Sequence, residues 1–183
     1  MKREGEYIMM VLRRKRGRGK VENIVLREAA EGDAEFLFRL MNDGAVRKAL
    51  GEPPTLMSDW EQAIAAWQED PDEEGYLVCL QGEPVGWFAV NGLLAEDGGV
   101  FLKMATLLPE YQNRGIGAVV LRELLGRLRG RGIGVVQLFT DRDNKVARRC
   151  YEKCGFRVAE AVVQRLSDGR EVPRVRMECD FEE

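Results

Sequence analysis

Apolar residues in this chain recur with two spacings, which mark two kinds of segment. Runs of alternating or continuous apolar residues predict strands at seven places: residues 24–27, 76–80, 85–90, 100–108, 135–140, 156–164 and 172–181. Apolar positions three or four residues apart predict four helices, at residues 33–41, 58–67, 116–128 and 144–154. The order of these segments is that of an α/β domain.

The connections between the segments indicate a mixed sheet. Residues 81–84 and 168–169 have the composition of hairpin turns, so the strands on either side of each are expected to be antiparallel. Residues 100–140 read as strand, helix and strand, and such a unit places its two strands parallel. Asp33 stands where the first helix begins and is the expected N-cap.

Composition fits one globular domain. The chain has 183 residues, 45% hydrophobic and 32% charged, which is typical of a folded protein with a core. It has no apolar run near the ~20 residues that a membrane span needs, and no signal-peptide pattern, so we expect a cytoplasmic protein without a membrane partner. Four cysteines without any histidine make a poor metal site, and no metal is expected.

Charge is unevenly distributed. Residues 1–20 carry eight basic and two acidic side chains, a net of +6, so residues 21–183 carry −9 of the total of −3. We therefore expect a basic N-terminal arm, disordered or loosely attached, ahead of the domain at residues 21–183. The arm is compatible with a nucleic-acid or ribosome contact, a solvated tail, or an extension before a start at Met9 or Met10. The body shows neither stacked aromatic residues nor a basic face, which makes nucleic acid an unlikely partner.

A glycine-rich turn is the strongest chemical signal. It joins the strand at residues 100–108 to the next helix and consists of Gln112, Asn113, Arg114, Gly115, Ile116, Gly117 and Ala118. The unpaired N–H groups of a helix start attract anions, and glycine lets a phosphate approach the backbone closely. The arginine adds positive charge. The turn therefore predicts binding of a small molecule that carries phosphate.

Two common phosphate sites match the turn less well. A nucleotide-hydrolysing loop needs a Gly-Lys-Ser/Thr ending, which is absent. A dinucleotide site would use Asp141, which follows the glycines by about 20 residues, as its ribose ligand. However, Val120 occupies the position of the third glycine, and the rest of the chain supplies antiparallel strands.

Two blocks of the sequence resemble the GNAT superfamily of N-acetyltransferases. Residues 112–117 resemble its Gln/Arg-x-x-Gly-x-Gly/Ala signature, which holds the coenzyme A pyrophosphate. Residues 144–156 resemble its Asn-x3-Ala pattern running into Tyr-Glu-Lys-x-Gly-Phe. The resemblance covers about residues 24–181. It implies a mixed, mostly antiparallel sheet of six to seven strands with a splayed central parallel pair, flanked by about four helices.

The resemblance also assigns roles to residues around the splayed pair. The strand before the glycine turn would carry a bulge, and backbone groups of Ala105, Thr106 and Leu107 would bind the pantetheine arm. The N–H of Leu107, at the bulge, would face the oxyanion of the reaction. Asn144 would hydrogen-bond the same arm, and the alternative for this residue is a helix N-cap.

Tyr151 matches the position of the family's general acid, which supports the departing thiolate. The alternative is a packed aromatic ring whose hydroxyl reaches solvent. A general base does not emerge from the sequence. There is no histidine, the strand at residues 100–104 has no acid, and Glu110 is expected on the surface.

The resemblance implies an acetyl-CoA-dependent N-acetyltransferase in which a primary amine attacks the acetyl group directly in a ternary complex. The acceptor would be a polyamine-like or aminoglycoside-like small molecule, or a protein N-terminus, and a homodimer is left open. The acidic cluster at residues 69–74 would suit a cationic acceptor. Trp60 and Trp67 either line an acceptor pocket or belong to the core. The alternative function is a non-catalytic module that binds acyl-CoA.

Overall fold

The computed structural model describes residues 11–16, 20–51, 53–96, 99–165 and 170–181. The strands are β1 (Val11–Arg16), β2 (Lys20–Glu28), β3 (Glu73–Leu80), β4 (Glu83–Asn91), β5 (Gly99–Leu107), β6 (Val135–Asp141), β7 (Arg157–Arg165) and β8 (Glu171–Asp180). The α-helices are α1 (Ala34–Asn42), α2 (Gly44–Leu50), α3 (Met57–Glu69), α4 (Ile116–Gly130) and α5 (Lys145–Glu152). Short 3-10 helices, η1 (Glu31–Asp33) and η2 (Pro109–Tyr111), complete the described elements.

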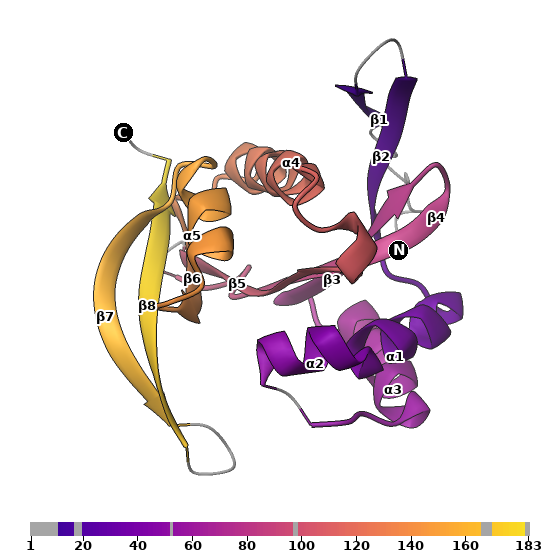
Figure 1. The fold of residues 1–183 in the computed structure, drawn as a ribbon, viewed down its shortest axis with the longest axis horizontal. Helices are drawn as coiled ribbons and strands as arrows, with labels where there is room; N and C mark the ends of the chain where they lie inside the picture. The colour runs from indigo at the N-terminus through magenta and orange to yellow at the C-terminus, as the bar shows by residue number, and fades with distance from the viewer. Residues whose placement is uncertain (1–10, 17–19, 52, 97–98, 166–169, 182–183) are drawn as a thin grey trace.

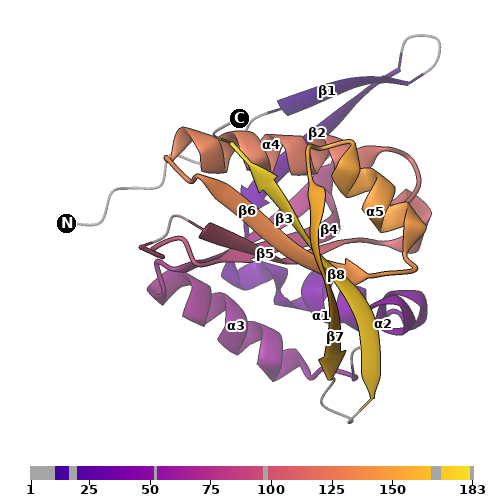
Figure 2. The same cartoon turned by 90° about the vertical axis from the view of Figure 1, so that its left-hand side faces the viewer.

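All eight strands form one sheet in the order β1-β2-β3-β4-β5-β6-β8-β7. The β5–β6 pair is parallel, and the other six neighbouring pairs are antiparallel. Helices α1, α2 and α3 cover one face, and α4 and α5 cover the other (Figures 1 and 2). The mixed, mostly antiparallel α/β fold predicted from the sequence is confirmed.

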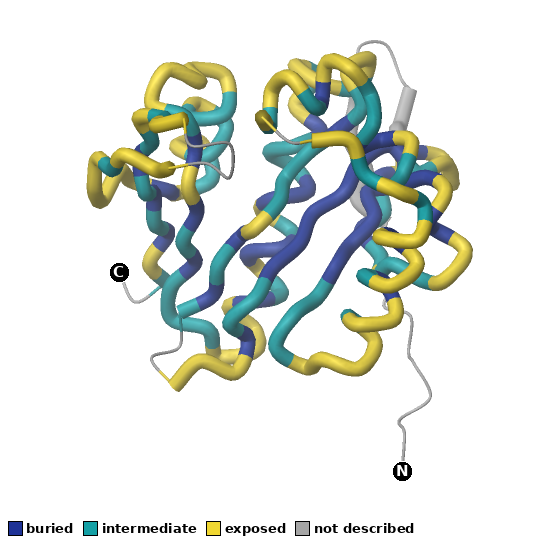
Figure 3. The backbone as a smooth tube through the Cα atoms, turned by 90° about the horizontal axis from the view of Figure 1, so that it is seen from below, coloured by how far each residue is buried: buried dark blue, intermediate teal, exposed yellow. Residues whose placement is uncertain are grey.

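Each face of the sheet has its own core. Leu37 and Ile64 pack on Leu77 beneath α1 and α3, whereas Leu124 of α4 belongs to the core that contains Val78. Leu77 and Val78 are neighbours in β3 that point to opposite faces, as strand geometry requires. Buried residues are concentrated in the central strands (Figure 3). The central sheet is thus fixed on both sides.

The details of the prediction need three corrections. The sheet has an eighth strand because Val11–Arg16, part of the expected loose arm, pair with β2 as β1. A fifth helix, α2, lies between the predicted helices at residues 33–41 and 58–67, where no element was predicted. Asp33 stands at the N-cap of α1 without capping it through its side chain. Residues 1–10 and 17–19 of the arm and the hairpin turn at 168–169 lie outside the described residues.

The parallel pair splays as expected. Pairing of β5 with β6 is limited to Gly99–Val135, Val100–Val136 and Phe101–Gln137. Strand β5 then continues to Leu107 and β6 to Asp141 without further pairing to each other, so a gap opens between their carboxyl ends. Within the described ranges, no helix is long and apolar enough to cross a membrane.

The bulge in β5 lies closer to the start of the strand than expected. The β4–β5 register shifts between Ala89 and Val90, which pair with Met104 and Leu102, so Lys103 is the extra residue. Leu107 pairs regularly with Gly86. The placement of Leu107 at the bulge is therefore wrong, and its role must rest on a different feature of β5.

Candidate active site

The glycine-rich turn has the geometry of an anion site. Asn113 and Gly115 have positive φ angles of 55° and 77°, and Gly115 is the N-cap of α4. No side chain caps this helix start. The first bond of the helix runs from the N–H of Val119 to the carbonyl oxygen of Gly115, at 3.3 Å. The preceding N–H groups of the first turn therefore lack intrahelical acceptors and lie at the positive end of the helix dipole.

Two side chains of the turn fold back on the segment before it. Gln112 Nε2 donates to the carbonyl oxygen of Leu107 at 2.8 Å. Arg114 Nη1 donates to the carbonyl oxygen of Glu110 at 3.1 Å, and its guanidinium lies 5.4 Å from the centre of the Tyr111 ring. These contacts fix the turn relative to the end of β5 and hold the arginine charge beside it.

The register of β5 determines which backbone groups face the gap. The N–H of Leu108 donates to the carbonyl of Val85 on β4 at 2.9 Å. Ladder bonds alternate along an antiparallel strand, so Thr106 also directs its backbone groups to β4. Ala105 and Leu107 direct theirs away from β4, toward the gap. Since the Leu107 carbonyl already accepts the Gln112 bond, its N–H is the group presented there.

The end of β5, the start of α4 and the middle of α5 meet at Gly117. A Cβ atom at Gly117 would lie 3.8 Å from Cys150 Sγ and 3.9 Å from Leu107 Cδ1. The residue after this cysteine is Tyr151. The structure therefore brings together three of the sequence-predicted groups, namely the glycine turn, Leu107 and the α5 block.

Tyr151 is half-buried, with its ring 5.8 Å from that of Phe156. Burial, together with the nearby Cys150 and Cys154, raises the pKa of Tyr151 to about 12. Its hydroxyl makes no hydrogen bond to any described residue. The side chain is thus a neutral proton donor at physiological pH, available to a ligand.

Cys150 and Cys154 lie next to the start of α4. Cys154 Sγ donates to the carbonyl oxygen of Ala118 at 3.5 Å. The neighbouring Cys154 thiol, with charge from Arg122 and Lys153, lowers the pKa of Cys150 to about 7. All four cysteines are free thiols. Their spacing along the sequence gave no sign of this position beside the site.

Asn144 is the N-cap of α5. Its Oδ1 accepts a hydrogen bond from the N–H of Ala147 at 3.0 Å. The capping alternative is therefore correct for the side-chain oxygen. The contact to a pantetheine arm stays a prediction, and it would have to come from the side-chain amide group.

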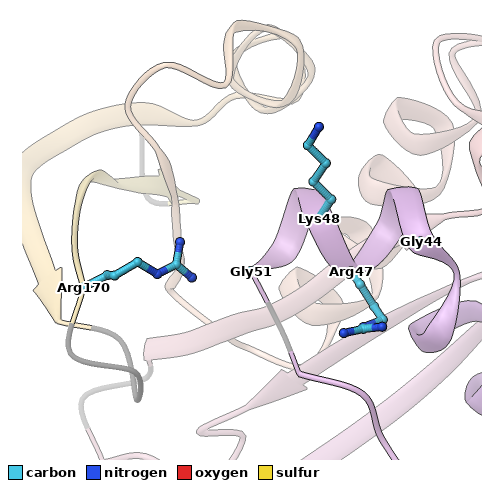
Figure 4. A pocket seen from close by; sticks show the side chains of 5 residues that line it. All are labelled: Gly44, Arg47, Lys48, Gly51 and Arg170. Atoms are coloured by element: carbon cyan, nitrogen blue, oxygen red, sulfur yellow. The ribbon is translucent and has the colours of Figure 1, made fainter.

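Two cavities lie near the sheet, one basic and one acidic. The basic cavity, of about 410 Å³, is lined by Gly44, Arg47, Lys48, Gly51 and Arg170 (Figure 4). The acidic cavity, of about 440 Å³, is lined by Glu28, Ala29, Trp67, Gln68, Glu69, Asp70, Pro71, Glu73, Glu74 and Gly75. The sequence analysis identified the acidic cluster and missed the basic one, whose members come from distant segments.

The acidic cavity and the glycine turn lie at opposite ends of the central strands. Glu73 pairs with Asn91, which pairs with Phe101 near the start of β5, whereas the turn follows the end of that strand. Trp60 is only 7% exposed and donates through Nε1 to Thr55 Oγ1 at 2.9 Å, so it is a core residue. Trp67 lines the acidic cavity instead.

A glycine-rich turn at a helix start, beside a splayed parallel pair, is the arrangement that the resemblance to the N-acetyltransferases implied. The family model described as "Acetyltransferase (GNAT) family" matches residues 39–156. The chain belongs to this family.

Curated relatives include the "Uncharacterized N-acetyltransferase MJ1207" of Methanocaldococcus jannaschii, 28% identical over 56% of this chain and 48% of the relative. A mycothiol acetyltransferase of Nocardiopsis dassonvillei is 29% identical over 63% of this chain and 43% of its own length. The chain therefore spans less than half of these two relatives. The [Ribosomal protein bS18]-alanine N-acetyltransferase of Escherichia coli K12 is 31% identical over 54% of this chain and 68% of the relative.

Solved structures share the fold at low identity. A spermidine N-acetyltransferase from Vibrio cholerae in complex with CoA and spermine superposes with a TM-score of 0.77, at 20% identity over 86% of this chain and 95% of that one. An aminoglycoside acetyltransferase in complex with coenzyme A gives a TM-score of 0.71, at 23% identity over 87% and 95% of the two chains.

Proposed function

We propose that this protein is an acetyl-CoA-dependent N-acetyltransferase that transfers the acetyl group to a primary amine by direct attack in a ternary complex. One observation carries the proposal: the uncapped start of α4, the gap-facing N–H of Leu107 and the unbonded hydroxyl of Tyr151 belong to three segments that meet at Gly117. Family membership and neighbours crystallised with CoA support the same function.

The described residues fit coenzyme A. The N–H groups of Gly115 to Ala118 would hold the pyrophosphate at the dipole of α4, with charge from Arg114 nearby. Backbone groups of Ala105 and Leu107 would pair with the amides of the pantetheine arm in the gap. Acetyl-CoA supplies the activated thioester when bound.

The reaction exchanges one bond to the acetyl carbon for another. The amine nitrogen forms a C–N bond, the C–S bond breaks, and the amine proton passes to solvent. The N–H of Leu107 would stabilise the oxyanion, and loss of such a donor typically costs about 10²–10³ in rate. Tyr151, with its pKa near 12, would stabilise the departing thiolate through a hydrogen bond. Full transfer of its proton to this thiolate, whose conjugate thiol has a pKa near 8.5, runs uphill by roughly 5 kcal/mol.

Substitutions at Gly117 test the binding half of the proposal. A Cβ there would meet its neighbours at ordinary contact distances of 3.8 and 3.9 Å, so Gly117→Ala should bind CoA within about threefold of the wild type. Gly117→Asp adds a negative charge beside the phosphates, and its CoA affinity in calorimetry should fall at least about tenfold. Equal affinity of the Asp variant would overturn the assignment of the turn.

Release of free thiol from acetyl-CoA, measured across a panel of amines, tests the catalytic half. We expect turnover with at least one primary amine. CoA binding without turnover on any amine would instead indicate a non-catalytic acyl-CoA-binding module.

A further inference from the structure

Two thiols beside the glycine turn take no part in the proposed reaction. We propose that Cys150 and Cys154 are a modification site, where hydrogen peroxide forms a reversible disulfide that displaces Tyr151. The disulfide itself goes beyond the proposed function and does not depend on it. Only the effect of the disulfide on turnover rests on the proposed function.

The positions of the two sulfur atoms are the first argument. Cys150 Sγ lies 3.8 Å from the position that a Cβ atom at Gly117 would take. Cys154 Sγ donates to the carbonyl oxygen of Ala118, the next residue of α4, at 3.5 Å. Both thiols therefore lie against the first turn of the same helix and neighbour each other. Both side chains are only partly buried, so a small oxidant can reach them.

The spacing of the two residues is the second argument. Cα atoms four residues apart on a helix are separated by about 6 Å, which is within the range of roughly 4.4–6.8 Å that a disulfide spans. Cys154 lies in the turn that follows α5, where its N–H donates to the carbonyl oxygen of Tyr151 at 2.8 Å. The residues on either side, Lys153 and Gly155, are exposed. This turn can therefore adjust without disturbing the core.

The surroundings give the two thiols different roles. The Cys154 thiol, with charge from Arg122 and Lys153, lowers the pKa of Cys150 to about 7, so much of this thiol is ionised near neutral pH. The contact with Cys150 and burial raise the pKa of Cys154. Because the thiolate is the nucleophile, Cys150 would react with the oxidant first, and Cys154 would resolve the product.

Hydrogen peroxide supplies both oxidising equivalents. The Cys150 thiolate attacks one peroxide oxygen, the O–O bond breaks, and hydroxide leaves as Cys150 becomes a sulfenic acid. The Cys154 sulfur then attacks the Cys150 sulfur, the S–O bond breaks, and the Cys154 proton leaves with the oxygen as water. A thiol such as dithiothreitol reverses the reaction by exchange.

Closing the bridge would move Tyr151. Cβ atoms four residues apart on a helix lie about 5–6 Å apart, and a disulfide requires roughly 3.5–4.5 Å, so the segment must contract by about 1–2 Å. Tyr151 lies within that segment, and its carbonyl oxygen accepts from the N–H groups of Cys154 and Phe156. A misplacement of about 1 Å can cost on the order of 10² in rate. The oxidised protein would therefore be the less active form.

Peptide mapping tests the modification site directly. The reduced protein is treated with hydrogen peroxide, its remaining thiols are blocked with N-ethylmaleimide, and it is digested with trypsin. Cleavage after lysine and arginine separates the two cysteines into peptides 150–153 and 154–157. We expect mass spectrometry to find these two peptides joined, and to find them separate after dithiothreitol. A bridge from Cys154 to the nearby Cys179, or no bridge at all, would overturn the site.

Serine variants test the order of the two steps. In Cys154→Ser the sulfenic acid has no resolving thiol, so dimedone should label Cys150. In Cys150→Ser no bridge should form, and oxidation of Cys154 should be at least about tenfold slower than that of Cys150 in the wild type. Cys79→Ala, in the core beneath α1 and α3, is the control and should form the bridge like the wild type.

Turnover before and after peroxide tests the displacement of Tyr151. We expect kcat to fall at least about tenfold in the wild type and in Cys79→Ala, and to recover with dithiothreitol. Turnover of Cys150→Ser should not respond to peroxide. Equal turnover of the bridged and reduced proteins would refute the displacement. If the reduced protein turns over no amine, the proposed function fails, and the peptide map still decides whether the modification site exists.

Discussion

Tyr151 shows how its surroundings set the chemistry of one side chain. In water a tyrosine loses its proton near pH 10, but burial raises the pKa of Tyr151 to about 12. A raised pKa makes the hydroxyl a poorer acid and keeps it protonated over the whole physiological range. Its contribution would therefore be a hydrogen bond to developing negative charge, and this contribution should not vary with pH between about 6 and 9.

Replacing Tyr151 with Phe keeps the ring against Phe156 and removes the hydroxyl. If that hydroxyl acts in the transition state, kcat should fall at least about tenfold while CoA affinity and the KM for the amine stay nearly constant. Steady-state kinetics and calorimetry give the two quantities. An active wild type with an equally active Phe variant would remove Tyr151 from the mechanism.

The sequence predicted which residues belong to the candidate site, but not which hydrogen bonds their atoms form. Gly115, Gly117 and Tyr151 were predicted as site residues because the glycine pattern and the two blocks that resemble the family are visible in the sequence. The capping role of the Asn144 oxygen, and the direction of the Thr106 backbone toward β4, depend on hydrogen bonds that only the folded chain defines.

At the scale of elements, an ion pair connects β2 to the start of α1. Arg27 Nη1 and Nη2 donate to Asp33 at 2.6 and 2.7 Å, and the N–H of Ala30 adds a bond of 2.8 Å. Burial alone would raise the pKa of Asp33, but the hydrogen bonds from Arg27 and Ala30 outweigh it and hold that pKa below its ordinary value. The carboxylate thus fixes the angle at which the chain leaves the sheet.

Asp33→Asn should destabilise the fold by roughly 2–3 kcal/mol near pH 7, at the low end for a buried pair because the Arg27 side chain is 32% exposed. Because the folded pKa is lowered, the stabilisation is complete above the unfolded value of about 3.9 and is lost as the pH falls through the folded pKa. Urea unfolding should therefore show the wild type and the variant converging in acid.

Asp59→Asn is the control for this experiment. Asp59 Oδ2 accepts from the N–H of Leu56 at 2.6 Å at an exposed helix start, with no arginine partner among the described residues. Its substitution should cost less than about 1 kcal/mol. Equal losses for the two variants would show that the Arg27 pair has no special role.

Short elements escaped prediction for a physical reason. Helix α2 has seven residues, too few for an apolar repeat to stand out. Asp43 directly follows α1, and its Oδ1 accepts from the N–H groups of Ala45 and Val46, so the same residue begins α2. Longer elements with buried faces, such as α4 and β3, were predicted because burial imposes the repeat on their sequence.

For the whole molecule, β1 lies at one end of the sheet order and pairs with β2 alone. Its partners in β2 are residues 20–25, whereas β2 joins β3 through residues 24–28. The buried Ile24 and Leu26 belong to the core with α4. The strands that carry the site are therefore joined to β2 through β3, at the edge of β2 opposite β1.

Deleting residues 1–16 should consequently leave the fold and the site intact. We expect a loss of less than about 1 kcal/mol, or roughly 2–4 °C in the melting temperature of a chain of this size, with unchanged CoA affinity. Thermal unfolding and calorimetry on the shortened chain measure both. A much larger drop would make β1 an integral part of the domain.

The early end of the β5–β6 pairing gives this sheet two edges in its interior. Unpaired N–H and C=O groups on an exposed edge strand invite pairing with strands of other chains, which leads to aggregation. Here the open ladder beyond Phe101 and Gln137 lies between the helices of the two faces, where another chain cannot easily lie alongside it (Figure 2). A thin, amide-bearing ligand can still enter. The fold thus keeps the recognition chemistry of a sheet edge and limits access to it by size.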